Sequence, residues 1–103
     1  MNEYYAVIFS SVRSKEHGDE YGMMAERMIE LASEQSGFIG VESCRNDDGF
    51  GITVCYWESL EAIENWRNHS MHCEAKQRGK SSFYDEFKLR ISKVISEREW
   101  VRE

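Results

Sequence analysis

The amino-acid sequence predicts an α+β domain with ferredoxin-like βαββαβ topology, in which two helices cover one face of a four-stranded antiparallel sheet. Three observations predict it. Runs rich in aromatic and β-branched residues occupy 3–13, 38–45 and 52–58, a helix-like apolar period follows the first run, and the turn-rich NDDGFG separates the other two. With 103 residues, 41% of them hydrophobic, the chain is expected to form one domain over 1–103.

The first strand and helix are predicted from EYYAVIFSSVR at 3–13 and from the periodic segment after it. Asp19 is the expected N-cap of the helix, and Gly37 is expected to stop it. The apolar face of this helix recurs at spacings of three and four residues: Tyr21, Met24, Met28 and Leu31.

A hairpin is predicted from FIGVESCR at 38–45 and ITVCYWE at 52–58. It can place Cys44 and Cys55 opposite each other. Three scattered cysteines do not indicate a disulfide framework, so packed thiols are expected.

The second helix is expected to start at a Ser59 cap and to turn Leu60, Ile63 and Trp66 to one side. It can kink or restart near His69, because Ser70 is itself a plausible cap. A last long strand then alternates an apolar side (Phe83, Phe87, Leu89, Ile91) with a polar one (Tyr84, Glu86, Lys88, Arg90).

The charge balance argues against several partners. There are 19 acidic and 13 basic side chains, a formal net charge of -6, and KQRGK at 76–80 is only a modest basic cluster. Nucleic acids and anionic membrane surfaces require clustered Lys and Arg, so neither is expected as a partner. No signal-peptide pattern or apolar run of about 20 residues is present, so we expect a cytoplasmic protein.

The first strand is apolar on both faces, because one side carries Tyr5, Val7 and Phe9 and the other carries Tyr4, Ala6 and Ile8. Two helices can cover only one face of a sheet. The other face would be a large exposed apolar patch in a monomer. We therefore predict a homodimer in which two sheets pack face to face.

Most of the chain resembles the antibiotic biosynthesis monooxygenase superfamily, and more narrowly its small bacillus-type members of uncertain activity. The stretches that carry the resemblance are SGFIGVES, GITVCYWESLEAIENWRNHSMHCEAKQRG and FYDEF. The likeness runs from about Tyr4 to Trp100. It implies a dimeric α+β barrel with a pocket between the sheet and the helices. Known relatives include cofactor-independent oxygenases of polycyclic aromatics or quinols, haem-binding proteins that degrade haem, and proteins without an established reaction.

His72 is the candidate catalytic base. Imidazole titrates near neutral pH, and many close relatives carry a histidine six residues after the helix tryptophan. Trp66 is the candidate stacking wall for a planar ligand. Further candidate substrate-binding residues are His69, Tyr84, Tyr5, Phe9, Phe83 and Met24. Each of these residues has a purely structural interpretation as well, either in the core or, for His69, on the surface.

A metal site is not expected. His69, His72 and Cys73 form H-x-x-H-C, but adjacent helical residues diverge by about 100 degrees, and no C-x-x-C pair completes a tetrahedral set. Haem stays an alternative, with His72 or His69 as axial ligand. Two departures from the haem-degrading members weaken it: their iron-binding histidine corresponds to about Lys76, and the first strand has no asparagine after Asn2.

Three functions therefore compete. The first is a cofactor-independent monooxygenase, or binding protein, for a planar aromatic or quinone-like small molecule. The second is a haem-binding or haem-degrading monooxygenase. The third is a non-catalytic ligand-binding dimer whose pocket is small or filled by its own side chains.

Overall fold

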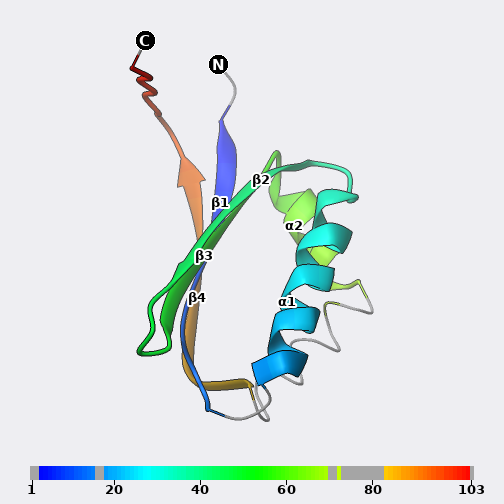
Figure 1. The fold of residues 1–103 in the computed structure, drawn as a ribbon. Coiled ribbons are helices and arrows are strands. Elements are labelled where there is room, and N and C mark those ends of the chain that lie inside the picture. Colours follow the sequence, from blue (N-terminus) through cyan, green and yellow to red (C-terminus); the bar gives the residue numbers. More distant parts are fainter. Residues whose placement is uncertain (1–2, 16–17, 70–71, 73–82, 103) are drawn as a thin grey trace.

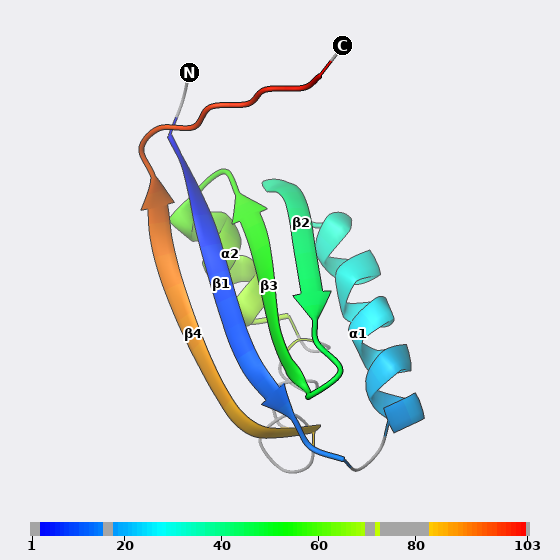
Figure 2. The ribbon, with the colours of Figure 1, turned by 60° about the vertical axis from the view of Figure 1, so that its left-hand side comes forward.

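A computed structural model describes residues 3–15, 18–69, 72 and 83–102. The element order is β1 (Tyr4–Arg13), α1 (Gly18–Ser33), β2 (Phe38–Arg45), β3 (Phe50–Trp57), α2 (Leu60–Arg67) and β4 (Tyr84–Val94). The strands form one antiparallel sheet in the order β2-β3-β1-β4. Both helices lie on the same side of it (Figure 1), and Figure 2 looks onto the opposite side. The predicted ferredoxin-like topology is confirmed.

The strand register defines two faces of the sheet. Tyr5 pairs with Trp57 and Val7 pairs with Cys55, and directly opposed residues share a face. These side chains pack against residues of both helices, so we call this side the inner face. The open face, which the described helices leave uncovered, carries apolar side chains of β1 and β3: Ala6, Ile8, Val12, Phe50, Ile52 and Val54. The apolar character of both faces of β1 is confirmed.

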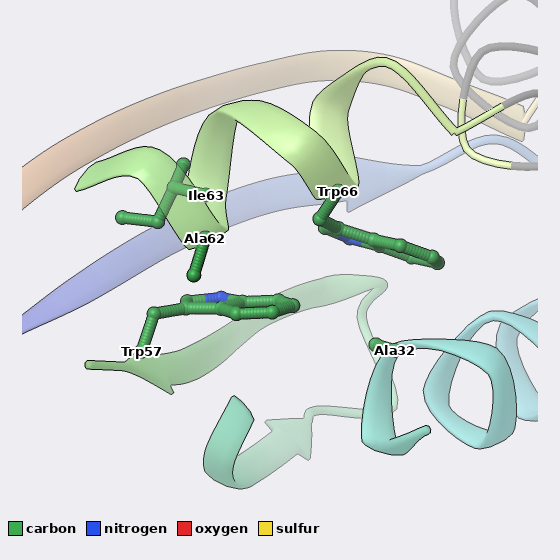
Figure 3. Packing of buried hydrophobic residues seen from close by; sticks show 5 residues of the cluster. All are labelled: Ala32, Trp57, Ala62, Ile63 and Trp66. Carbon is green, nitrogen blue, oxygen red and sulfur yellow. The ribbon is translucent and has the colours of Figure 1, made fainter. Parts of the chain in front are cut away.

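The core lies where the end of β3 meets the two helices. Trp57 is 1% exposed and is surrounded by four other buried residues (Figure 3): Ala32, Ala62, Ile63 and Trp66. Phe38 packs edge-on against Trp57 with ring centroids 5.3 Å apart. The predicted inward side of α2 is therefore correct for Ile63 and Trp66 but wrong for Leu60, which is 54% exposed. Leu60 occupies the first turn, where Ala62 takes the position against the core instead.

The helix ends agree with the predictions in part. Ser59 caps α2, because its hydroxyl oxygen accepts a hydrogen bond from the Ala62 amide at 3.0 Å. Asp19 is not a cap, because α1 begins one residue earlier, at Gly18. Its carboxylate lies in the first turn, where it still interacts favourably with the helix dipole. Ser70, the second predicted cap, lies outside the described residues.

A shift of register between β1 and β4 changes which way Tyr84 points. Val12 pairs with Glu86, but Arg13 pairs with Tyr84, so Asp85 is an extra residue. Strict alternation predicted Tyr84 on the polar side with Glu86. The shift instead turns its ring to the inner face, where it contacts Phe9.

A second shift, between β2 and β3, reverses the alternation in β2. Phe38 pairs with Trp57 but Gly40 pairs with Tyr56, which leaves Ile39 as the extra residue. As a consequence Cys44 pairs with Ile52 on the open face. Cys55 is opposite Val41 on the inner face, so the predicted juxtaposition of these two cysteines is wrong.

Candidate functional site

The first group of candidate residues is built around Trp66. Its indole stacks on that of Trp57, with centroids 6.3 Å apart and an interplanar angle of 26°. His69 is tilted against Trp66 at 5.4 Å, and His72 meets it edge-on at 5.0 Å. His69 was expected more on the surface than in a site, and the structure shows it half-buried against the indole. Trp66 lies in the last turn of α2 and His69 follows the C-cap Asn68, and both imidazoles contact the Trp66 ring.

His72 lies partly inside the protein. The residue is half-buried, and its Nδ1 atom is shielded from solvent. Its geometry is compatible with the predicted role as a base, and that role stays a prediction.

The second group lies at the other end of the inner face, where β1 ends and β4 begins. Phe9 contacts Tyr84 at 5.2 Å, and Tyr21 of α1 meets both Phe83 and Tyr84 edge-on at 5.6 Å. Phe83 is 2% exposed, whereas Phe9, Tyr21 and Tyr84 are half-buried. Phe83 is therefore a packing residue, and the other three rings retain access to solvent.

The remaining candidates lie between or beside these groups. Tyr5 is half-buried and packs against the core cluster near Trp57. Met24 is half-buried on α1, one turn from Tyr21. The structure therefore separates the eight predicted site residues into an α2 group and a β4 group, rather than one compact set.

Sequence reasoning missed a polar cluster in the β4 group, which we call the Arg45 cluster: Arg45, Ser11, Tyr21 and Tyr84. The Arg45 Nη2 donates to Ser11 Oγ at 2.8 Å and to Tyr21 Oη at 3.2 Å. Burial and hydrogen bonding to Tyr21 raise the pKa of Tyr84 above its ordinary value, so this phenol is protonated at neutral pH. The direction of Arg45 was not predicted from the sequence, because it depends on the extra residue Ile39 in β2.

Arg13 supports the same corner of the molecule. Its guanidinium lies over the Tyr21 ring, 3.7 Å from the centroid, and its Nε donates to the Phe83 carbonyl oxygen at 3.2 Å. A cation held over an aromatic face orients that ring. Tyr21 is thus fixed between an arginine on its face and two aromatic rings at its edges.

No group of three His, Cys, Asp or Glu side chains suited to a metal ion occurs in the described part of the chain. Cys73 and Lys76, which entered the metal and haem arguments, lie outside that part. A haem ligand must present a ring nitrogen to the iron. Since Nδ1 of His72 is shielded, the Nε2 atom of His72 and the ring of His69 are the candidates for such a role among the described residues.

The element order and the strand order define the class of protein: a small α+β domain of ferredoxin-like topology, with an aromatic stack on the inner face of its sheet. None of the described helices combines the length and apolar character needed to cross a bilayer. Residues 4–78 match the family described as Antibiotic biosynthesis monooxygenase, and the chain belongs to that family.

Individual relatives agree with this assignment. The uncharacterized protein YqjZ of Bacillus subtilis (strain 168) is 54% identical over 95 residues, which cover 92% of this chain and 82% of YqjZ. A putative antibiotic biosynthesis monooxygenase from Nitrosomonas europaea superposes with a TM-score of 0.79 at 7% identity, covering 92% of this chain and 93% of that one. SnoaB, a cofactor-independent oxygenase from Streptomyces nogalater, superposes with a TM-score of 0.72 at 13% identity, and the match covers 100% of each chain. At these identities the two structures support the fold alone.

Proposed function

We propose that this protein binds a planar aromatic or quinone-like molecule between the sheet and its helices, and oxygenates it without a metal or flavin. The observation that carries the proposal is the group of rings on the inner face of a member of this family, in which Trp66 stacks on Trp57 and His72 meets Trp66 edge-on. An aromatic wall beside a titratable imidazole is what such chemistry requires. The name of SnoaB, a cofactor-independent oxygenase of the same fold, supports it.

The reaction needs no external reductant when the substrate is a phenol with a free para carbon. His72 takes the hydroxyl proton, and the resulting anion donates one electron to O₂. The radical pair recombines at the para carbon, and the hydroperoxide loses water to leave a quinone. One oxygen atom enters the product and the other leaves in water, while the substrate supplies all four electrons.

Oxygen consumption tests this proposal. Wild-type protein is mixed with 1-naphthol and with a panel of related naphthols and hydroquinones. Oxygen uptake is measured with an oxygen electrode, and product formation is measured by absorbance. We expect turnover of at least one naphthol to fall by about 10²-fold or more in His72→Ala, the typical contribution of a general base. His69→Ala, which removes the other imidazole on Trp66, is compared with His72→Ala to show whether the loss is specific to His72. A His72→Ala protein as active as wild type would remove His72 from the mechanism.

We also propose that two copies associate through their open faces. Phe50 and Ile52 are each 41% exposed there, beside Ile8 and Val54 on the neighbouring strand positions. An apolar sheet face without a covering layer is stabilised by packing on another such face. Sedimentation should give a dimer for wild type and for Met23→Lys, an exposed position on α1, and a monomer for Ile52→Lys. A wild-type monomer at micromolar concentration would contradict the proposal.

Binding without reaction is the competing function that the same geometry permits. Saturable binding of naphthols without oxygen uptake would identify a ligand-binding protein. A Soret shift on titration with haemin, reduced in His72→Ala or His69→Ala, would instead indicate haem as the ligand.

A further inference from the structure

Arg45 lies across the inner face of the sheet with its charge directed at neutral oxygens. It pairs with Gly51, where a Cβ would come within 2.6 Å of the Arg45 Cζ, so the absent side chain leaves the space that the guanidinium occupies. Nη2 donates to Ser11 Oγ and Tyr21 Oη, and Nη1 donates to the backbone oxygens of Ser11 and Gly49. Of the ion pairs between described residues, none involves Arg45. This half-buried side chain therefore presents a positive charge that the described residues do not neutralise.

Two phenolic hydroxyls lie beside this cation. Tyr21 and Tyr84 meet edge-on at 5.6 Å and share a hydrogen bond. Burial, followed by this hydrogen bond, raises the pKa of Tyr84, while the charges of Arg45 and Arg13 act in the opposite direction. The two guanidinium groups thus favour an oxyanion at this place, and Tyr84 itself stays a neutral hydroxyl at physiological pH.

The cluster is positioned to meet a ligand on the inner face. Arg45, Tyr21 and Tyr84 are half-buried, so part of each residue remains exposed. Phe9 contacts Tyr84 and lies two residues along β1 from Val7, which packs against the core cluster that includes Trp66. The inner face of β1 therefore runs from the Arg45 cluster, past Phe9 and Val7, to the core cluster that includes Trp66.

We infer that Arg45, Tyr21 and Tyr84 form an oxyanion-binding end of the ligand site, which selects planar aromatic molecules bearing a carboxylate or a phenolate. The inference rests on the proposed function, because it names the substrate class of that site. A guanidinium and phenolic hydroxyls together supply a charge and directional donors to such an oxygen. The same residues would tether β2 to β1 in a purely structural role, but a tether confers no preference for a charged ligand.

A pair of nearly isosteric probes separates the two roles. Binding of 2-naphthoate and 2-naphthamide is measured by calorimetry at neutral pH in wild type and in Arg45→Met. We expect wild type to bind the carboxylate about tenfold more tightly than the amide, the size of one charge-assisted hydrogen bond. Arg45→Met should lose that preference while it keeps its affinity for the amide. Arg27→Met, which removes an exposed arginine of α1, is the matched control for net charge and should keep the preference.

The outcomes distinguish this inference from the function on which it rests. Equal binding of the two probes by wild type, or an unchanged preference in Arg45→Met, would overturn the oxyanion site alone. The aromatic site is tested separately with Trp66→Leu. If this substitution weakens binding of the amide, the aromatic site is still supported. Failure of both probes to bind would overturn both. If Arg45→Met does not fold, Tyr21→Phe decides, because loss of one hydroxyl donor should reduce the preference without removing it.

Phenolates are tested by a separate measurement. The absorption of 1-naphthol is recorded without oxygen while protein is added at a pH below the ordinary pKa of the phenol. We expect the phenolate band to appear with wild type and with Arg27→Met but not with Arg45→Met. A phenolate band of equal size in all three proteins would assign the ionisation to some other group.

Discussion

The indole of Trp66 lies on the indole of Trp57, with ring centroids 6.3 Å apart and planes inclined by 26°. This contact joins α2 to the end of β3. Trp57 is thus the centre of the core, and it also supports Trp66 in the candidate site. Stability and ligand binding therefore share a structural element.

Trp57 is expected to be the most costly core residue to truncate. It is 1% exposed and contacts both Phe38 and Trp66. Trp57→Ala should lower the free energy of unfolding by about 3–5 kcal/mol, the usual cost of a large buried side chain. Urea denaturation measures it. Trp100→Ala, at a position 74% exposed, is the control and should change stability by less than about 0.5 kcal/mol.

Gly51 is predicted to be required for the placement of Arg45. An added Cβ would come within 2.6 Å of the Arg45 Cζ, so the guanidinium must leave its bonds to Ser11 and Tyr21. We expect Gly51→Ala to cost about 1–3 kcal/mol of stability. The same substitution should reduce the preference for 2-naphthoate over 2-naphthamide. Gly40→Ala, where an added Cβ meets nothing within 4 Å, is the control, and equal effects of the two substitutions would contradict this account.

Substitution of Gly22 by alanine is expected to stabilise the protein. Gly22 lies inside α1, and a Cβ there would meet nothing within 4 Å. Gly22→Ala should raise the free energy of unfolding by about 0.5–1 kcal/mol, because alanine loses less backbone entropy on folding. Thermal unfolding checks the sign. Gly37→Ala should destabilise instead, because Gly37 has a φ of 88° and a Cβ would approach the Ala62 Cβ to 2.6 Å.

Cys55 is expected to make stability fall at high pH. Burial raises the pKa of its thiol from 9.0 to about 11, so the folded protein holds this proton more tightly than the unfolded chain. The resulting stabilisation is complete below pH 9 and is lost as the pH rises through 11. It is on the order of 2 kcal/mol. Urea unfolding of wild type and Cys55→Ala at pH 8 and pH 11, under reducing conditions, measures the difference, and identical pH dependence in the two proteins would show that Cys55 contributes nothing.

Local patterns were sufficient to predict the order and type of the elements. The aromatic and β-branched runs became β1, β2 and β3 to within two residues at each end, and Ser59 caps α2 as predicted. The same patterns brought Trp66 inward, because its spacing from Ile63 repeats once per helical turn. His72 was chosen by residue type and by family resemblance, and the structure adds its contact with Trp66.

The Arg45 cluster could not be predicted in this way. Side-chain direction in a strand is counted from its neighbours, and one extra residue reverses it for all positions that follow. Ile39 in β2 and Asp85 in β4 are such residues, and nothing in their side chains marks them. Tyr84 was therefore predicted on the polar side of its strand, and the direction of Arg45 was not predicted.

The sequence by itself determined the secondary structure, the topology and the two apolar faces of the sheet, because periodicity and turn chemistry are local properties. The tertiary structure decided which polar side chains reach the inner face. That choice depends on how each strand pairs with its neighbour, and the pairing joins residues as distant as Arg13 and Tyr84. The aromatic wall at Trp66 was thus predictable from its own helix, whereas the position of the Arg45 cation on the inner face emerged only from the register of the assembled sheet.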